Sequence, residues 1–322
     1  MNRPLFRWLR WGFAAIVVAA LLVYLDLDSM GDHLRNVQWW VAAPAILSLT
    51  LLHIVAALTW RHLARTLGNM EMSRTFAVRA FYISQALGSI TPGNLGGDAY
   101  RVHAVNGQGT GWQQAAVPIV AQRLTSYVAL ALLGVIATLV IPVSLAFRAM
   151  LLLIPAAALL VVAATWAFVR FRSDSKFLGG LAQRENGTSA FWRAFLTGSA
   201  MGLAFHGLAI VAGFVLLTSV APNPEVLAAL AAISIARVAS VLPITPSGIG
   251  VQEAGLALLL PLAGVDAEAA VAFAALSRLA FVLTSIAGVT LLLFRDRSQA
   301  AGNNANEPLR YQHRKQMQSS RR

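Results

Sequence analysis

Long apolar segments are the feature of this sequence that most restricts its fold. They lie at about 8–26, 38–60, 113–140, 149–170, 194–219 and 269–294, and each approaches or exceeds the roughly 20 residues needed to cross a bilayer core. The 322-residue chain is 57% hydrophobic and only 12% charged. Because a soluble domain carries about 25% charged residues, we predict an all-α, polytopic membrane protein.

The composition also excludes several classes of function. Cysteine is absent, so disulfides and thiolate metal sites are excluded. The net charge of +12 does not indicate nucleic acid binding, because the basic residues lie between apolar segments, as membrane topology requires. No nucleophile elbow or HExxH motif occurs, and we expect His53 and His206 to be hydrogen-bonded within the helix bundle. We therefore predict no enzyme activity, no metal and no cofactor.

Two similar motifs interrupt the apolar pattern. Residues 89–101 read SITPGNLGGDAYR, and residues 241–255 read VLPITPSGIGVQEAG. Each motif follows an apolar segment, 76–90 or 226–242, that is too short for an ordinary crossing. The shared Ile-Thr-Pro and the glycines after it predict an internal duplication.

The charged residues repeat with the motifs. Arg123 stands 25 positions after Asp98, and Arg278 stands 25 positions after Glu253. Both arginines are followed by leucine, and both acids are followed by alanine. The equal spacing of an acid and a distant arginine strengthens the case for a duplication.

The distribution of basic residues predicts that the segments 76–90 and 226–242 are re-entrant. If each enters and leaves on one face, most Lys and Arg residues lie on the cytoplasmic side. If both crossed, the basic stretch 170–193 would face outward, against the positive-inside rule. We therefore predict about six full crossings and two re-entrant hairpins broken by Pro and Gly, with both termini in the cytoplasm.

In this topology the second half of the chain crosses the membrane in the opposite sense to the first half. Residues 1–294 form one transmembrane domain, with repeat A at about 1–140 and repeat B at about 149–294. Residues 295–322 form a basic, disordered cytoplasmic tail. Inverted repeats with broken helices are typical of transporters, whose substrate site lies between the repeats.

Five charged residues are predicted within the membrane. Each costs roughly 2.5–3.5 kcal/mol at the bilayer centre, so the charges either pair or line a polar pathway. In the structural interpretation, Asp98 pairs with Arg123 and Glu253 with Arg278, which holds each hairpin against a helix. In the functional interpretation, which we favour, these residues and Arg237 mark a substrate path.

The Pro and Gly residues predict tight reversals at the two motifs. Proline stops a helix, and glycine allows the reversal, which exposes backbone N–H groups beside a helix N-terminus. With arginines nearby, such a site favours an anionic group such as a lipid phosphate. The predicted substrate-binding residues are Pro92, Gly93, Gly96, Gly97, Asp98, Arg101, Arg123, Arg237, Pro246, Gly248, Gly250, Glu253 and Arg278.

Three segments resemble the lysylphosphatidylglycerol synthase transmembrane region, a family of flippase-like membrane proteins. They are TPGNLGGDAYR at 91–101, QRLTSY at 122–127 and PITPSGIGVQEAGL at 243–256. The resemblance extends over about 10–295. It implies a helical bundle that moves a polar lipid between leaflets.

The chain departs from this family in two respects. Family members often carry an acid where this chain has Gln122, so the resemblance leaves the partner of Arg123 open. The bifunctional members also carry a soluble aminoacyl transferase domain, for which the tail after residue 295 is too short. We therefore do not expect this chain to synthesise the lipid.

These observations lead us to predict a lipid flippase of the bacterial inner membrane. Its substrate would be a membrane phospholipid or lipid-linked molecule with a polar, anionic or lipid-linked headgroup. Two alternatives stay open. One is an intramembrane transferase that modifies a lipid, with Asp98 or Glu253 as base. The other is a non-transporting membrane partner of a lipid-biosynthesis enzyme.

Overall fold

The computed structural model describes residues 37–91, 93–106, 111–141, 143–172, 187–241, 248 and 250–294. All regular structure in these residues is helical, so the predicted all-α class is confirmed. The predicted crossing at 8–26, Pro92, Pro246 and the tail lie outside the described residues. The helices are α3 (Trp39–Leu51), α4 (His53–Gly68), α5 (Arg74–Gly88), α6 (Leu95–Asn106), α7 (Trp112–Val140), α8 (Leu145–Arg172), α10 (Gly187–Thr218), α11 (Val226–Val241), α12 (Val251–Leu259), η2 (Leu260–Ala263) and α13 (Ala267–Leu293).

Within the described residues, four helical segments are long and apolar enough to cross a membrane. They agree in position with the predicted crossings that begin at residues 38, 113, 194 and 269. α8 covers the predicted crossing at 149–170. The four segments are Trp39–Gly68, Trp112–Val140, Phe191–Thr218 and Ala267–Leu293.

The segment that begins at Trp39 is longer than predicted. It consists of α3 and α4, which meet at Leu52, and it continues to Gly68 instead of ending near residue 60. The helix continues past the charged residue Arg61. The Nε of Arg61 donates a hydrogen bond to the Met72 carbonyl at 2.8 Å. The helix ends where Asn69 adopts a left-handed conformation, with φ of 51°.

The first short segment and its motif form a helical hairpin of α5 and α6. Ser73 caps α5 by accepting a hydrogen bond from the Phe76 N–H at 3.1 Å. The chain turns at Gly93 and Asn94, both of which have positive φ, of 57° and 60°. Gly93 therefore serves the reversal that the sequence predicts.

Gly96 and Gly97 have a different role from the one predicted. Both lie inside α6, where they allow close packing instead of the reversal itself. A Cβ atom on Gly97 would lie 2.2 Å from the Ser84 carbonyl oxygen, and one on Gly96 would lie 2.8 Å from that of Leu87. The absence of a side chain at the two glycines therefore allows the backbones of α5 and α6 to approach each other closely.

The second motif lies between α11 and α12, which form another hairpin together with η2. α11 is largely apolar and most of its residues are buried, since it packs against α7, α8, α10 and α12. Gly248 and Gly250 have positive φ, of 69° and 82°, just before α12 begins. Both glycines thus stand in conformations that favour glycine at this turn.

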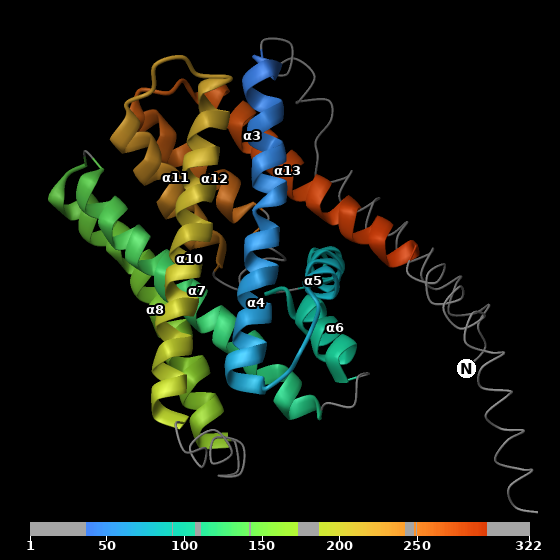
Figure 1. Cartoon of the computed structure of the whole chain (residues 1–322). Coiled ribbons are helices and arrows are strands. Elements are labelled where there is room, and N and C mark those ends of the chain that lie inside the picture. The colour runs from blue at the N-terminus through green and yellow to red at the C-terminus, as the bar shows by residue number, and fades with distance from the viewer. Residues whose placement is uncertain are drawn as a thin grey trace, which may run out of the picture.

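Each hairpin returns to the end of the bundle from which it departs. The Gln114 side chain after the first hairpin donates to the Gly68 carbonyl before it, at 2.6 Å. The Glu225 N–H before α11 donates to the Ala263 carbonyl at the end of η2, at 3.1 Å. In Figure 1, α5 and α6 lie in the lower half of the molecule, and α11 and α12 lie in the upper half. Re-entrant hairpins require this chain path, and their placement in a membrane stays a prediction.

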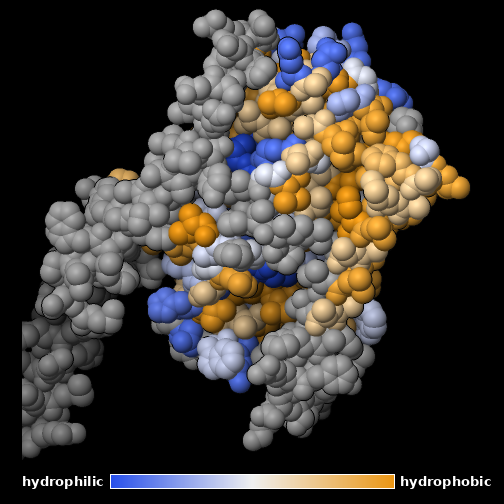
Figure 2. Space-filling view, turned by 180° about the vertical axis from the view of Figure 1, so that it is seen from behind, coloured by the Kyte–Doolittle hydropathy of each residue, from blue (hydrophilic) through white to orange (hydrophobic). Residues whose placement is uncertain are grey.

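The outward faces of the helices are apolar. Leu132, Ile136 and Leu139 on α7 are exposed, as are Leu153 and Leu160 on α8. Figure 2 shows hydrophobic residues over the right-hand side of the molecule, the side of α7 and α8 when it is seen from behind. Such a surface suits contact with the apolar core of a bilayer.

Candidate functional site

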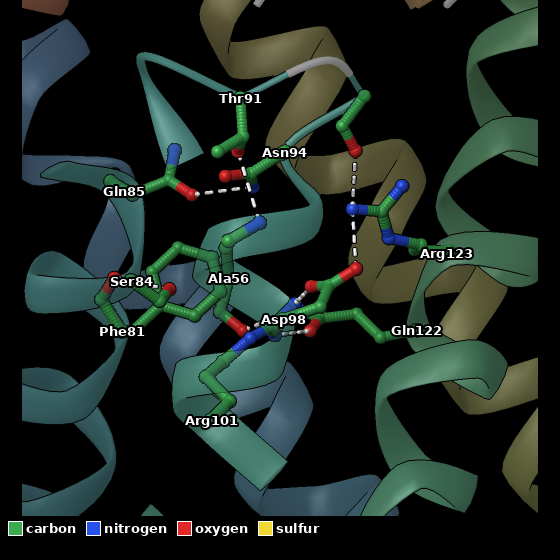
Figure 3. Close-up of polar contacts among 12 residues, drawn as sticks. Ala56, Phe81, Ser84, Gln85, Thr91, Asn94, Asp98, Arg101, Gln122 and Arg123 are labelled. Atoms are coloured by element: carbon green, nitrogen blue, oxygen red, sulfur yellow. Dashed lines mark hydrogen bonds and ion pairs between the residues drawn. The ribbon is translucent and has the colours of Figure 1, made fainter. Parts of the chain in front are cut away.

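Asp98 lies at the centre of a charged cluster between α6 and α7. It stands in the first turn of α6, where the helix dipole favours an acid. Its Oδ2 forms an ion pair with Arg123 Nη2 from α7, so the predicted Asp98–Arg123 pair is present (Figure 3). Its Oδ1 pairs with Arg101 Nη2, one turn further along α6. One carboxylate therefore holds two arginines.

Arg101 is buried, with 4% of its surface exposed, and its contacts extend to three other helices, α4, α5 and α7. Its Nη1 donates to Gln122 Oε1 at 2.7 Å. Gln122 Nε2 in turn donates to the Ala56 carbonyl of α4 at 2.7 Å. The guanidinium also lies over the Trp60 and Phe81 rings, 5.5 and 5.2 Å from their centroids, which adds cation–π stabilisation.

Arg123 connects the cluster to the turn of the first hairpin. Its Nη2 donates to the Gly93 carbonyl at 2.7 Å, and its Nη1 donates to the Tyr127 hydroxyl at 3.3 Å. Thr91 stabilises the same turn by accepting a hydrogen bond from the Gly96 N–H at 2.9 Å. The Gly96 N–H is therefore engaged within the hairpin.

A cavity of about 210 Å³ adjoins this cluster, lined by residues of α4, α5, α7 and α10 and of the first hairpin. Arg101 and Arg123 both line it, whereas Asp98 does not. Asn94, Gln122 and Ser126 contribute polar groups, and no Asp or Glu belongs to the described lining. The rings of His53, Phe81, Tyr127 and Phe205 form its aromatic part.

The second hairpin carries the other predicted ion pair. Arg278 of α13 donates from Nε to Glu253 Oε1 at 2.7 Å, and only 7% of Arg278 is exposed. Glu253 Oε2 also accepts the Gly250 N–H at 2.8 Å, which caps the first turn of α12. Here one carboxylate holds one arginine and a helix N-terminus.

Arg237 differs from the other arginines predicted within the membrane. It lies on α11, and its buried Nε has no hydrogen-bond partner among the described residues. It does not line the cavity beside the first hairpin.

The structure thus brings only part of the predicted set together. Gly93, Gly96, Gly97, Asp98, Arg101 and Arg123 gather at the first hairpin, and Gly248, Gly250, Glu253 and Arg278 at the second. Among the cavity residues that sequence reasoning did not select are Asn94, Tyr127 and Phe205. Asn94 lies inside the first motif and Tyr127 ends the QRLTSY segment, so their positions could have indicated them, whereas Phe205 lies in an apolar helix without such a signal.

The two histidines make the hydrogen bonds expected of them. His206 Nε2 lies 2.9 Å from Ser126 Oγ, and His53 Nδ1 lies 3.2 Å from the Thr50 carbonyl oxygen. Within the described part of the chain, no three side chains of His, Asp or Glu gather into a metal site. The polar groups at the cavity suit the binding of a charged organic group.

The family comparison agrees with this architecture. The profile described as the lysylphosphatidylglycerol synthase TM region matches residues 10–288, which includes both hairpins and both predicted ion pairs. The chain belongs to this family. The lysylphosphatidylglycerol synthase TM region indicates a membrane protein of lipid metabolism or transport. A search among curated proteins found no match.

Proposed function

We propose that this protein moves a lipid with a polar headgroup between the leaflets of a bacterial inner membrane. The observation that carries the proposal is the cavity lined by the charged side chains of Arg101 and Arg123 within a largely apolar bundle. Charged groups within membrane-spanning bundles ordinarily mark a substrate or ion path. Membership of a family in lipid metabolism or transport supports a lipid as the substrate.

The size of the cavity suits a headgroup and not a whole lipid. Its volume of about 210 Å³ is below the 300–1,000 Å³ that drug-sized ligands fill, so the acyl chains would stay in the surrounding bilayer. Asp98 would hold Arg101 and Arg123 in position, and Glu253 would hold Arg278. Two oppositely placed hairpins would then open the path alternately to each face, with both termini in the cytoplasm.

Leaflet exchange in proteoliposomes tests this function. Fluorescent phospholipids with labelled acyl chains are reconstituted with the protein, and an impermeant quencher reports the fraction in the outer leaflet. We expect faster exchange than in empty liposomes, and loss of most of that gain in the Asp98→Ala, Arg123→Ala, Glu253→Ala and Arg278→Ala variants. Arg65→Ala, which removes an exposed ion pair with Glu71 outside the cavity, should exchange like the wild type.

The same vesicles test the two alternatives. Chemical conversion of the labelled lipid by the purified protein would favour an intramembrane transferase. Absence of both exchange and conversion for every lipid class would contradict transport, and would favour a role as partner of a lipid-biosynthesis enzyme.

A further inference from the structure

The cluster at the cavity carries an excess of positive charge. Two guanidinium groups, of Arg101 and Arg123, are balanced by the single carboxylate of Asp98. Arginine stays protonated under all physiological conditions, so the cluster keeps one net positive charge. Both arginines line the cavity, whereas Asp98, which lies between them in Figure 3, does not, so the excess charge faces the space that a ligand would occupy.

Gln122 determines the size of this excess. Its side chain occupies the position beside Arg101 where a second carboxylate would complete the balance, with Oε1 2.7 Å from Arg101 Nη1. The neutral amide satisfies both neighbours, since it accepts from Arg101 and donates to the Ala56 carbonyl. A glutamate of nearly equal shape could accept from Arg101 but could not donate to Ala56.

We propose that this cavity selects lipids whose headgroup carries one net negative charge, as a phosphodiester does, and that Gln122 sets this preference. The proposal rests on the proposed function and specifies its substrate class. The phosphodiester oxygens accept hydrogen bonds from the cavity-facing guanidinium groups, which are fixed donors for phosphate. A zwitterionic or aminoacylated, cationic headgroup adds an ammonium group, for which no carboxylate belongs to the described lining.

The first test compares headgroups on the wild-type protein. Vesicles contain acyl-labelled phosphatidylglycerol, phosphatidylcholine or lysylphosphatidylglycerol, which are anionic, zwitterionic and cationic. We expect exchange of phosphatidylglycerol to exceed exchange of either other lipid by about tenfold, the ratio that one modest electrostatic contact provides. Equal rates for the three lipids would overturn the proposed selectivity and leave the flippase function standing.

The second test changes the charge of the cluster alone. Gln122→Glu should lower the ratio of phosphatidylglycerol to phosphatidylcholine exchange by about tenfold, because the cluster becomes neutral. Gln114→Glu is a control at an exposed position on the same helix. It also loses an amide donor to a backbone carbonyl, that of Gly68, but it lies outside the cavity lining and should leave the ratio unchanged. An unchanged ratio in Gln122→Glu would overturn the role of Gln122.

Binding measured without transport separates the two proposals. Short-chain phosphatidylglycerol should raise the melting temperature of the detergent-solubilised wild type more than short-chain phosphatidylcholine does. This difference should shrink in Gln122→Glu and persist in Gln114→Glu. Selective binding without leaflet exchange would contradict the flippase function and support the selectivity. Exchange without selective binding would support the flippase function and contradict the selectivity. If Gln122→Glu does not fold, the wild-type comparison still decides the selectivity.

Discussion

At the scale of single residues, Asp98 compensates two arginines that lie within the bundle. Replacing it with alanine leaves both guanidinium groups without their carboxylate. We expect Asp98→Ala to lower the free energy of unfolding by about 3–5 kcal/mol, the usual effect of removing one partner of a buried ion pair. Denaturant unfolding in detergent micelles measures the change.

Glu71 provides the control for Asp98. It also pairs with an arginine, Arg65, but its side chain is 80% exposed. Glu71→Ala should therefore cost less than about 1 kcal/mol, because exposed ion pairs contribute little. Equal losses of stability in Asp98→Ala and Glu71→Ala would show that the cluster at α6 is not energetically distinct from a surface pair.

Glu253 combines two roles that substitution can separate. It pairs with Arg278 and accepts the Gly250 N–H that caps α12. Glu253→Gln loses the charge but keeps an oxygen that can accept the N–H, whereas Glu253→Ala loses both. We expect the alanine variant to be less stable than the glutamine variant by about 1 kcal/mol, the value of a helix cap. Unfolding curves that coincide for the two variants would contradict a capping role.

At the scale of elements, the first hairpin depends on the close approach of α5 and α6. A Cβ on Gly97 would meet the Ser84 carbonyl oxygen at 2.2 Å, so the two helices would have to separate. We expect Gly97→Ala to lower the melting temperature clearly and to reduce leaflet exchange, because Arg101 and Asp98 lie on the displaced helix.

Gly207 on α10 provides the helical control for Gly97. A Cβ there would meet nothing within 4 Å. Gly207→Ala should be neutral or raise the free energy of unfolding by about 0.5–1 kcal/mol, because alanine favours a helix. A larger loss of stability in Gly207→Ala than in Gly97→Ala would contradict the packing explanation.

At the scale of the whole molecule, the chain path predicts which ends of the hairpins share a face of the membrane. Since the chain has no cysteine, single cysteines can be introduced without background labelling. We expect Glu71→Cys and Gly111→Cys to be protected from an impermeant maleimide in intact cells. Pro222→Cys and Asp266→Cys should react, because the second hairpin enters from the outer face. Reaction of Pro222→Cys but protection of Asp266→Cys would contradict the re-entrant topology.

Several features of the whole molecule were predictable from the sequence. The positions of α7, α10 and α13 follow from apolar length, because a bilayer requires helices about 20 residues long. The pairs Asp98–Arg123 and Glu253–Arg278 were predictable because charges within a membrane require partners and the repeated spacing offered one for each acid.

Other features required the tertiary structure. Arg101 joins Asp98, Gly97 packs against Ser84, and Gln122 reaches Ala56 of another helix. The sequence by itself determined which segments are helices, where the chain reverses and which acids need an arginine, because these depend on local conformation and on the cost of unpaired charge. The tertiary structure alone decided that two arginines and not their carboxylate face the cavity, because the direction of a side chain depends on how neighbouring helices pack.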